Sequence, residues 1–203
     1  MPAPWKVLSS RTTYADQWLK LRTDRCQSSR GHILEAYHVL EFPDWVNVVA
    51  LTNENRLILV KEYRHGAGEV LLGLPSGTRE QNDQNPEQTT RRELEEETGY
   101  TGGEYRFLGS YFANPATQRN RVSTFLAWGV QNNGTPSLDP SEDIEVVTED
   151  FIPFMRKIWS GGVSMQGLHL AAVHLALGFL ATEELKPSDP LLALRNQLFN
   201  IAR

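Results

Sequence analysis

The chain has 203 residues, a net charge of −5, 40% hydrophobic residues and 22% charged residues. This composition is ordinary for a soluble globular protein, and the acidic balance argues against a DNA-binding protein, which normally carries a basic field. No apolar run is long enough to span a bilayer, and the first residues lack the apolar core of a signal peptide, so we expect no membrane partner. The single cysteine, Cys26, cannot form an internal disulfide, which favours a cytoplasmic protein.

The first part of the chain is predicted to consist mainly of β-strands. Short β-like stretches lie within residues 5–15, 17–26 and 32–42, and the third follows the turn signal "SSRG". Two runs rich in Val, Ile and Leu follow at Trp45–Thr52 and Arg56–Tyr63, joined by "NEN". A short polar connection between two apolar runs predicts a hairpin that contains a buried strand.

The rest of the chain mixes helices with further strands. Pro86–Thr98 is predicted to be helical, because Asn85 can cap its start and Gly99 suits the left-handed residue after its end. Further strands are expected within residues 105–113, 121–130 and 144–148, and helices at Glu149–Trp159, at Leu168–Leu185 and in a short segment after Asp189. This order indicates an α+β or α/β sandwich formed by a single domain over residues 1–203.

The predicted helix Pro86–Thr98 carries an unusual concentration of glutamates. At about 100° per residue, Glu93, Glu96 and Glu97 fall within an arc of roughly 100°, whereas Glu95 points to the opposite side. Like charges at these spacings repel one another, and anions are disfavoured near the C-terminal end of a helix. The simpler interpretation is a solvated acidic face that pairs with neighbouring arginines. The alternative is a site for hard divalent cations, which prefer oxygen ligands.

The segment "GLPSGTREQNDQNPEQTTRRELEEETGY" resembles the signature of Nudix hydrolases, G-x5-E-x7-R-E-U-x-E-E-x-G-U, in which U is a bulky apolar residue. The second half of the signature is complete, at Arg92, Glu93, Leu94, Glu96, Glu97, Gly99 and Tyr100. The first half departs from it, because the signature glutamate falls on Gln84 and Gly77 lies one residue too far upstream. The loop therefore contains a one-residue insertion.

The resemblance implies an αβα sandwich with a central mixed sheet, in which residues 1–42 form an N-terminal β arm and 43–203 the Nudix core. It implies that Glu93 and Glu97 are the main ligands of Mg²⁺, with Mn²⁺ as an alternative, since both ions accept carboxylate oxygens. Glu96 would be a third ligand and the backbone carbonyl of Ser76 a fourth. Arg92 would orient the glutamates without taking part in the chemistry.

The stretch "VKEYRHGAGEVLLGLPSG" resembles the ADP-ribose and nucleotide-sugar pyrophosphatase branch, where a tyrosine-arginine pair leads to E-L-P-A-G. Arg64 corresponds to that arginine and would hold phosphate oxygens, whereas Gly73 stands where the branch has glutamate. Glu142 is the expected catalytic base, with Asp143 and Glu145 as alternatives, or the segment is an ordinary solvated turn.

Trp45 and Arg119 are further candidates for contact with the nucleotide, although an aromatic residue at the start of a strand often belongs to the core. The branch also implies a homodimer joined through the N-terminal arm. The expected reaction is hydrolysis of the pyrophosphate bond of a nucleoside diphosphate sugar such as ADP-ribose. One alternative is another nucleotide substrate, namely a nucleoside triphosphate, a dinucleoside polyphosphate or capped RNA. The other is a catalytically inactive module that binds a nucleotide sugar.

Overall fold

A computed structural model describes residues 3–140 and 142–200 of the chain. Two compact units are present. One contains the described residues up to Asp44 together with Tyr111–Val122, and the other contains Trp45–Ser110 and the described residues from Ser123 onward. In the described part of the chain, no helix is long and apolar enough to cross a membrane.

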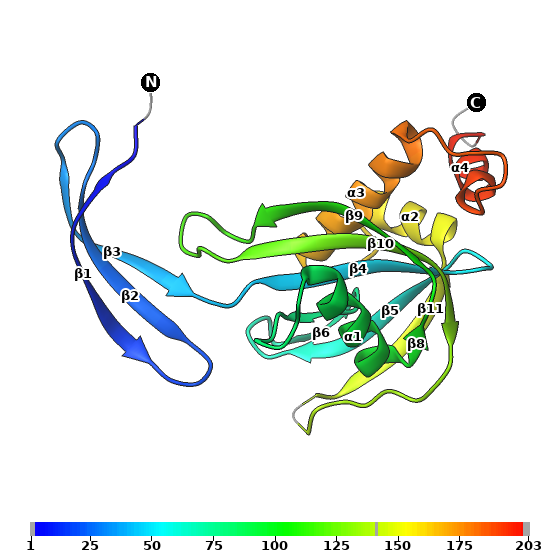
Figure 1. The fold of residues 1–203 in the computed structure, drawn as a ribbon, viewed down its shortest axis with the longest axis horizontal. Helices are drawn as coiled ribbons and strands as arrows, with labels where there is room; N and C mark the ends of the chain where they lie inside the picture. The colour runs from blue at the N-terminus through cyan, green and yellow to red at the C-terminus, as the bar shows by residue number, and fades with distance from the viewer. Residues whose placement is uncertain (1–2, 141, 201–203) are drawn as a thin grey trace. The chain divides into compact units, whose positions relative to one another are not determined.

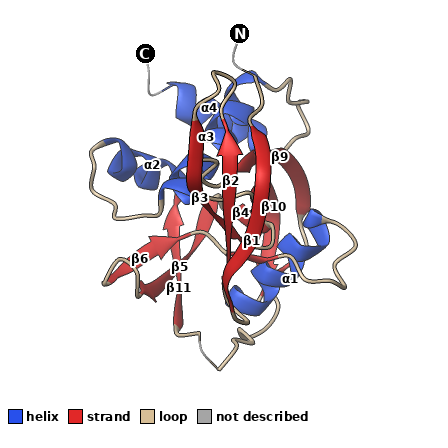
Figure 2. Cartoon of the chain, turned by 90° about the vertical axis from the view of Figure 1, so that its left-hand side faces the viewer, coloured by secondary structure: helices blue, strands red, loops and turns tan. Residues whose placement is uncertain are grey.

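The first unit is built on a three-stranded antiparallel sheet in the order β1-β2-β3, shown in Figure 2. Its strands are Lys6–Ala15 (β1), Lys20–Gln27 (β2) and Ile33–Glu41 (β3). The segment Tyr111–Val122 joins this unit through β3, where the Tyr37 hydroxyl donates to the Ala116 carbonyl at 2.6 Å. Most side chains of the three strands are exposed, so this sheet has little core of its own.

The second unit is built on a larger sheet with the strand order β11-β5-β4-β10-β8, extended by β6 beside β5, β7 beside β4 and β9 beside β10 (Figure 1). The strands are Trp45–Thr52 (β4), Arg56–Arg64 (β5), Glu69–Gly73 (β6), Ser76–Thr78 (β7), Tyr100–Thr101 (β8), Glu104–Phe112 (β9), Arg121–Asn132 (β10) and Ile144–Asp150 (β11). The helices are Pro86–Thr98 (α1), Phe151–Trp159 (α2), Gly167–Thr182 (α3) and Leu191–Asn200 (α4).

Alternation along the central strands divides the core into two layers. Successive strand residues point to opposite faces of a sheet. On β4, Val48 and Ala50 pack in a cluster with Leu94 of α1, whereas Val49 and Leu51 pack in a second cluster with residues of α2, α3 and α4. The sheet therefore has α1 on one face and the three C-terminal helices on the other. The predicted α+β fold, an αβα sandwich around a mixed sheet, is confirmed.

The predicted hairpin of β4 and β5 and the predicted helix Pro86–Thr98 are present with almost the expected bounds. The helix expected from Glu149 begins at Phe151 instead, because Glu149 and Asp150 extend β11 beside β5. The helix expected at Leu168–Leu185 ends at Thr182. The short strands β6, β7 and β8 were not predicted, since runs of two to five residues show no clear periodicity.

Candidate active site

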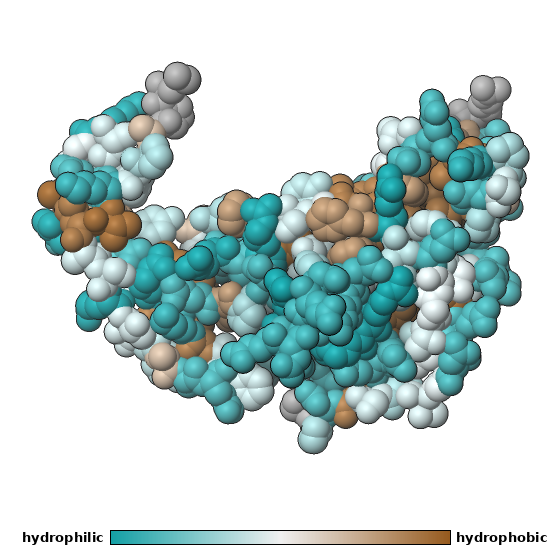
Figure 3. Space-filling view, viewed as in Figure 1, coloured by the Kyte–Doolittle hydropathy of each residue, from teal (hydrophilic) through white to brown (hydrophobic). Residues whose placement is uncertain are grey.

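The helix α1 is capped at both ends and buries one of its faces against the sheet. The Asn85 side chain accepts a hydrogen bond from the Gln88 N–H at 2.9 Å, and Gly99 ends the helix with φ 73°. Leu94 is fully buried and Glu97 is only 5% exposed, whereas Glu95 is exposed. In Figure 3, hydrophilic residues gather over the position of α1. The helical repeat therefore places Glu97 toward the sheet and Glu95 toward solvent, as predicted.

Glu93 and Glu97 lie against the backbone of β7. Glu97 Oε2 accepts a hydrogen bond from the Ser76 N–H at 3.0 Å. The Glu93 carboxyl group lies so close to Gly77 that a Cβ added there would be 2.1 Å from the carboxyl carbon. Glycine at position 77 is thus what allows the Glu93 carboxyl group to approach this backbone. Despite the insertion in the loop, the glycine still faces the glutamate pair.

The carboxylates of this region influence one another electrostatically. Burial raises the pKa of Glu93 to about 7, although the neighbouring Arg92 acts in the opposite direction. Burial also raises the pKa of Glu97 well above its ordinary value, and the charges of Glu93, Glu142 and Glu62 raise it further. Glu93, Glu142 and Glu62 of β5 are therefore near enough for their charges to act on Glu97. Such a concentration of negative charge favours a cation.

Arg92 connects α1 to the loop that precedes it. Its Nη2 group lies 3.1 Å from Asp83 Oδ2 and donates to the Thr78 carbonyl at 3.1 Å. On the helix it pairs with Glu93 at 3.0 Å and with Glu96 at 2.7 Å. The guanidinium of Arg92 thus links Glu93 and Glu96 to the loop. A planar guanidinium with several N–H donors can orient carboxylates in this way.

The loop carboxylate that Arg92 binds is Asp83, which is buried, and the neighbouring Gln84 is exposed. Asp83 Oδ2 also accepts hydrogen bonds from the Glu80 N–H at 2.9 Å and the Thr89 hydroxyl at 3.0 Å. Burial alone would raise the pKa of Asp83, but these contacts and Arg92 outweigh it and lower the pKa. Asp83 is therefore an ionised anchor for the loop.

The remaining candidates lie on separate elements. Glu142 precedes β11, and its Oε2 accepts a hydrogen bond from the Asp139 N–H at 3.0 Å. Its rival Glu145 is paired with Lys61 at 3.2 Å. Arg64, at the end of β5, pairs through Nη2 with Glu62 at 2.9 Å. In β5, Glu62 lies opposite Ile144 of β11, so strand pairing brings the Arg64 end of β5 to the acidic segment.

The last two candidates, Trp45 and Arg119, lie in different compact units. Trp45 is partly buried at the start of β4, opposite Thr78 of β7. Arg119 belongs to the other compact unit, where its Nη1 lies 3.9 Å from Glu41 Oε1. Their contact with a nucleotide stays a prediction.

The donor set suits a hard divalent cation. Among the described residues, no three acidic, histidine or cysteine side chains already converge as metal ligands. Mg²⁺, however, is commonly held by one or two carboxylates together with water and substrate phosphates. Glu93 supplies a partly buried carboxylate and Glu97 a buried one, and the pKa values of both are raised mainly by burial. The residues present therefore fit such a cation.

Comparison with known proteins agrees with this geometry. The profile of the NUDIX domain matches residues 42–157, which is more than half of the chain. The chain belongs to the Nudix hydrolase family. A second profile, described as the nucleoside diphosphate sugar hydrolase N-terminal domain, matches residues 5–40 of this Nudix hydrolase. The two profiles together cover β1–β3 and most of the larger unit.

Three curated relatives are similar to this Nudix hydrolase. A methanol dehydrogenase activator of Bacillus methanolicus is 27% identical over 143 residues, which cover 70% of this chain and 76% of the relative. An ADP-ribose pyrophosphatase of Mycobacterium tuberculosis is 28% identical over 138 residues, 68% of this chain and 66% of the relative. An ADP-ribose pyrophosphatase of Bacillus subtilis is 35% identical over 89 residues, and the match covers 44% of this chain and 48% of the relative.

Among solved structures, a crystal structure of an ADP compounds hydrolase superposes with a TM-score of 0.77 and 18% sequence identity. The superposition covers 89% of this Nudix hydrolase and 96% of the other chain. At this identity the likeness shows a shared fold.

Proposed function

We propose that this Nudix hydrolase uses Mg²⁺, with Mn²⁺ as an alternative, to hydrolyse the pyrophosphate bond of a nucleoside diphosphate sugar such as ADP-ribose. The products are a nucleoside monophosphate and a sugar phosphate. The observation that carries the proposal is the placement of Glu93 against Gly77 and of Glu97 on the Ser76 N–H, near Glu62, the partner of Arg64. The N-terminal profile and the two relatives named ADP-ribose pyrophosphatase support this choice of substrate.

In this mechanism Glu93 and Glu97 would hold the cation, assisted by Glu96 and by the carbonyl of Ser76. A bound cation would neutralise the diphosphate and favour attack by water on phosphorus. Glu142 takes a proton from the attacking water as the new phosphorus–oxygen bond forms and the bridging bond breaks. Arg64 binds a phosphate oxygen through the N–H groups that its pairing with Glu62 leaves available. Arg92 keeps Glu93 and Glu96 in place.

The test measures product formation from ADP-ribose, ADP-glucose, GDP-mannose, diadenosine polyphosphates and nucleoside triphosphates in the presence of Mg²⁺. Hydrolysis of one sugar nucleotide should be lost in Glu97→Gln and kept in Glu95→Gln, because only Glu97 faces the site. Equal loss in both variants would contradict the assigned helix face. Turnover of triphosphates alone would reassign the substrate, and tight binding without turnover would favour a silent binding module.

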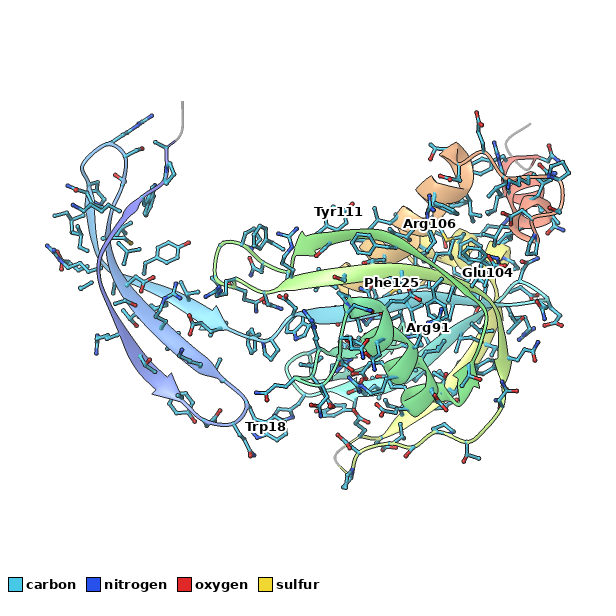
Figure 4. The ribbon with its side chains drawn as sticks, in the orientation of Figure 1. Trp18, Arg91, Glu104, Arg106, Tyr111 and Phe125 are labelled. Atoms are coloured by element: carbon cyan, nitrogen blue, oxygen red, sulfur yellow. The ribbon has the colours of Figure 1, made fainter. Side chains whose placement is uncertain are left out.

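We also propose that the protein is a homodimer in which a second copy covers the three-stranded sheet. Large aromatic side chains of that unit are exposed, including Trp5 (47%), Tyr14 (51%) and Trp18 (74%). Trp18 lies in the turn between β1 and β2 (Figure 4). Exposed aromatics on and beside strands that bury little of their own surface are typical of an interface. Sedimentation equilibrium should give twice the chain mass, and a monomer at micromolar concentration would contradict the proposal.

A further inference from the structure

A small pocket lies between β5, β6 and the start of α3. It has room for about one water-sized group, far less than a site that holds a whole drug-sized ligand. Its polar wall consists of Glu62, Arg64, Gln166 and His169, and its apolar lining comes from Val60, Leu71 and Leu72. The charge of Glu62 raises the pKa of Glu97, and the charge of Glu142 raises the pKa of Glu62. The pocket that Glu62 lines therefore borders the acidic residues of the candidate active site. It therefore suits one part of a nucleotide substrate.

The pocket depends on an unusual pair of residues, Gly73 and His169. His169 is 5% exposed, and its ring lies over Gly73. A Cβ added at Gly73 would be 3.0 Å from His169 Nδ1 and 3.2 Å from Cε1. The imidazole thus occupies space that a side chain at position 73 would need. The His169 ring can occupy its position only because residue 73 has no side chain.

The contacts of His169 determine which of its nitrogens carries hydrogen. Nδ1 accepts a hydrogen bond from the Leu74 N–H at 3.2 Å. Burial, together with the positive charge of Arg64, lowers the pKa of His169 to about 4, so the ring is neutral. In a neutral imidazole whose Nδ1 accepts, Nε2 carries the hydrogen and is a donor. No described residue accepts a hydrogen bond from Nε2, which leaves this donor for a ligand in the pocket.

The charge of the polar wall suggests what kind of ligand fits. The guanidinium of Arg64 is already paired with the carboxylate of Glu62 at 2.9 Å, and His169 is neutral, so the wall has little net charge. A phosphate placed deep in the pocket would meet the Glu62 carboxylate. An uncharged hydroxyl can instead accept from Nε2 of His169 and donate to Glu62. The apolar lining suits the C–H group of the carbon that carries this hydroxyl.

We propose that this pocket binds one hydroxyl group of a ribose unit of the substrate, with His169 Nε2–H as donor and Glu62 as acceptor. The proposal rests on the proposed function, since it assigns a subsite to the same substrate class. ADP-ribose contains two ribose units of the same chemistry, the nucleoside ribose and the terminal one. His169 is thereby a residue that determines specificity, and Gly73 is the position that makes room for it.

The test measures dissociation constants by calorimetry, in a Glu142→Gln background with Mg²⁺, so that binding is separated from turnover. The probes are ADP-ribose and two analogues, one 2-deoxy at the terminal ribose and one 2′-deoxy at the nucleoside ribose. His169→Asn keeps an acceptor for the Leu74 N–H but removes the Nε2 donor. It should weaken ADP-ribose binding about three- to tenfold, the effect of losing one uncharged hydrogen bond.

Comparing both proteins with all three ligands shows which ribose hydroxyl His169 binds. One of the two deoxy analogues should bind wild-type and His169→Asn equally, because the partner of His169 is then already missing, and that analogue identifies the ribose. If ADP-ribose and both analogues are all weakened by the same factor in His169→Asn, or none is weakened, the proposal is overturned.

His169→Gln is the matched control. Its side-chain N–H can replace the Nε2 donor, but it removes the acceptor of the Leu74 N–H. It should bind ADP-ribose nearly as well as wild type and melt at a lower temperature. Weakened binding and lower melting temperature to equal extents in both variants would mean that His169 only packs, which would overturn the proposal. Failure of the wild-type enzyme to hydrolyse any sugar nucleotide would contradict the proposed function separately, because these constants report binding.

Discussion

Asp83 Oδ2 lies 3.1 Å from Nη2 of Arg92, and this ion pair joins the loop before α1 to the arginine that holds Glu93 and Glu96. The Nudix signature has a glutamate at the position of Gln84, which is exposed in this chain. The insertion in the loop therefore accompanies a shift of the anchoring carboxylate by one residue.

Asp83→Asn should lower the free energy of unfolding by about 2–3 kcal/mol, somewhat less than for a fully buried ion pair, since Arg92 is partly exposed. Gln84→Glu should change it little. Because the pKa of Asp83 is lowered on folding, its contribution is present above the ordinary value of 3.8 and is lost as pH falls through the folded value. Denaturation curves at pH 7 and pH 3 should show the difference from wild type shrinking at low pH. A larger effect of Gln84→Glu would contradict this assignment.

Gly77→Ala should displace the carboxyl group of Glu93, because the new Cβ would lie about 2 Å from it. A flexible carboxyl group can move aside, so the melting temperature should change little. A misplacement of this size can lower kcat/KM by about 10²-fold. Assays over a range of Mg²⁺ concentrations check this expectation. Gly66→Ala is the control, since its Cβ would meet no atom within 4 Å. Equal activity of the two variants would show that Glu93 tolerates the shift.

Glu97→Gln should stabilise the metal-free protein at pH 8. The pKa of Glu97 is raised on folding, so its contribution to stability is present below the ordinary value of 4.5 and is lost as pH rises through the folded value. Mg²⁺ should raise the melting temperature of wild type at pH 8 but not that of Glu97→Gln, because binding to the native state stabilises it. Glu95→Gln should respond like wild type. A full Mg²⁺ response in Glu97→Gln would remove Glu97 from the ligands.

Gly178→Ala should raise the free energy of unfolding by about 0.5–1 kcal/mol, because glycine within a helix costs backbone entropy. Position 178 lies in α3, and an added Cβ would meet nothing within 4 Å. The same substitution at Gly99 should destabilise, since φ there is +73° and the Cβ would lie 2.4 Å from the Gly134 carbonyl oxygen. Thermal denaturation of both variants provides the check. Shifts of the same sign would contradict the backbone argument.

Short-range features of this chain were predictable from its sequence. Asn85, Pro86 and Gly99 mark the ends of α1, and the helical repeat alone separates Glu95 from the other glutamates. Both depend only on residues close together in the chain. The strands β4 and β5 were predictable for the same reason, as continuous runs of buried β-branched and leucine residues.

Contacts that depend on tertiary structure were not predictable in this way. Counting back from Arg92 leads to Gln84 and counting forward from Gly77 leads to Asp83, and the fold of the loop decides between them because Asp83 meets Arg92. Glu62 joins the carboxylates because β5 pairs with β11, far away in sequence. His169 lies in an apolar helix, where the sequence around it indicates packing. Its contact with Leu74, 95 residues earlier, has no local signal.

The close approach of His169 to Gly73 also constrains how this protein can evolve. A mutation that introduces a side chain at position 73 would crowd the ring, and loss of the ring alone would leave the Leu74 N–H without its acceptor. Neither position can change first without a penalty, whereas the two together can change more easily. The order in which the two positions can be substituted is therefore restricted.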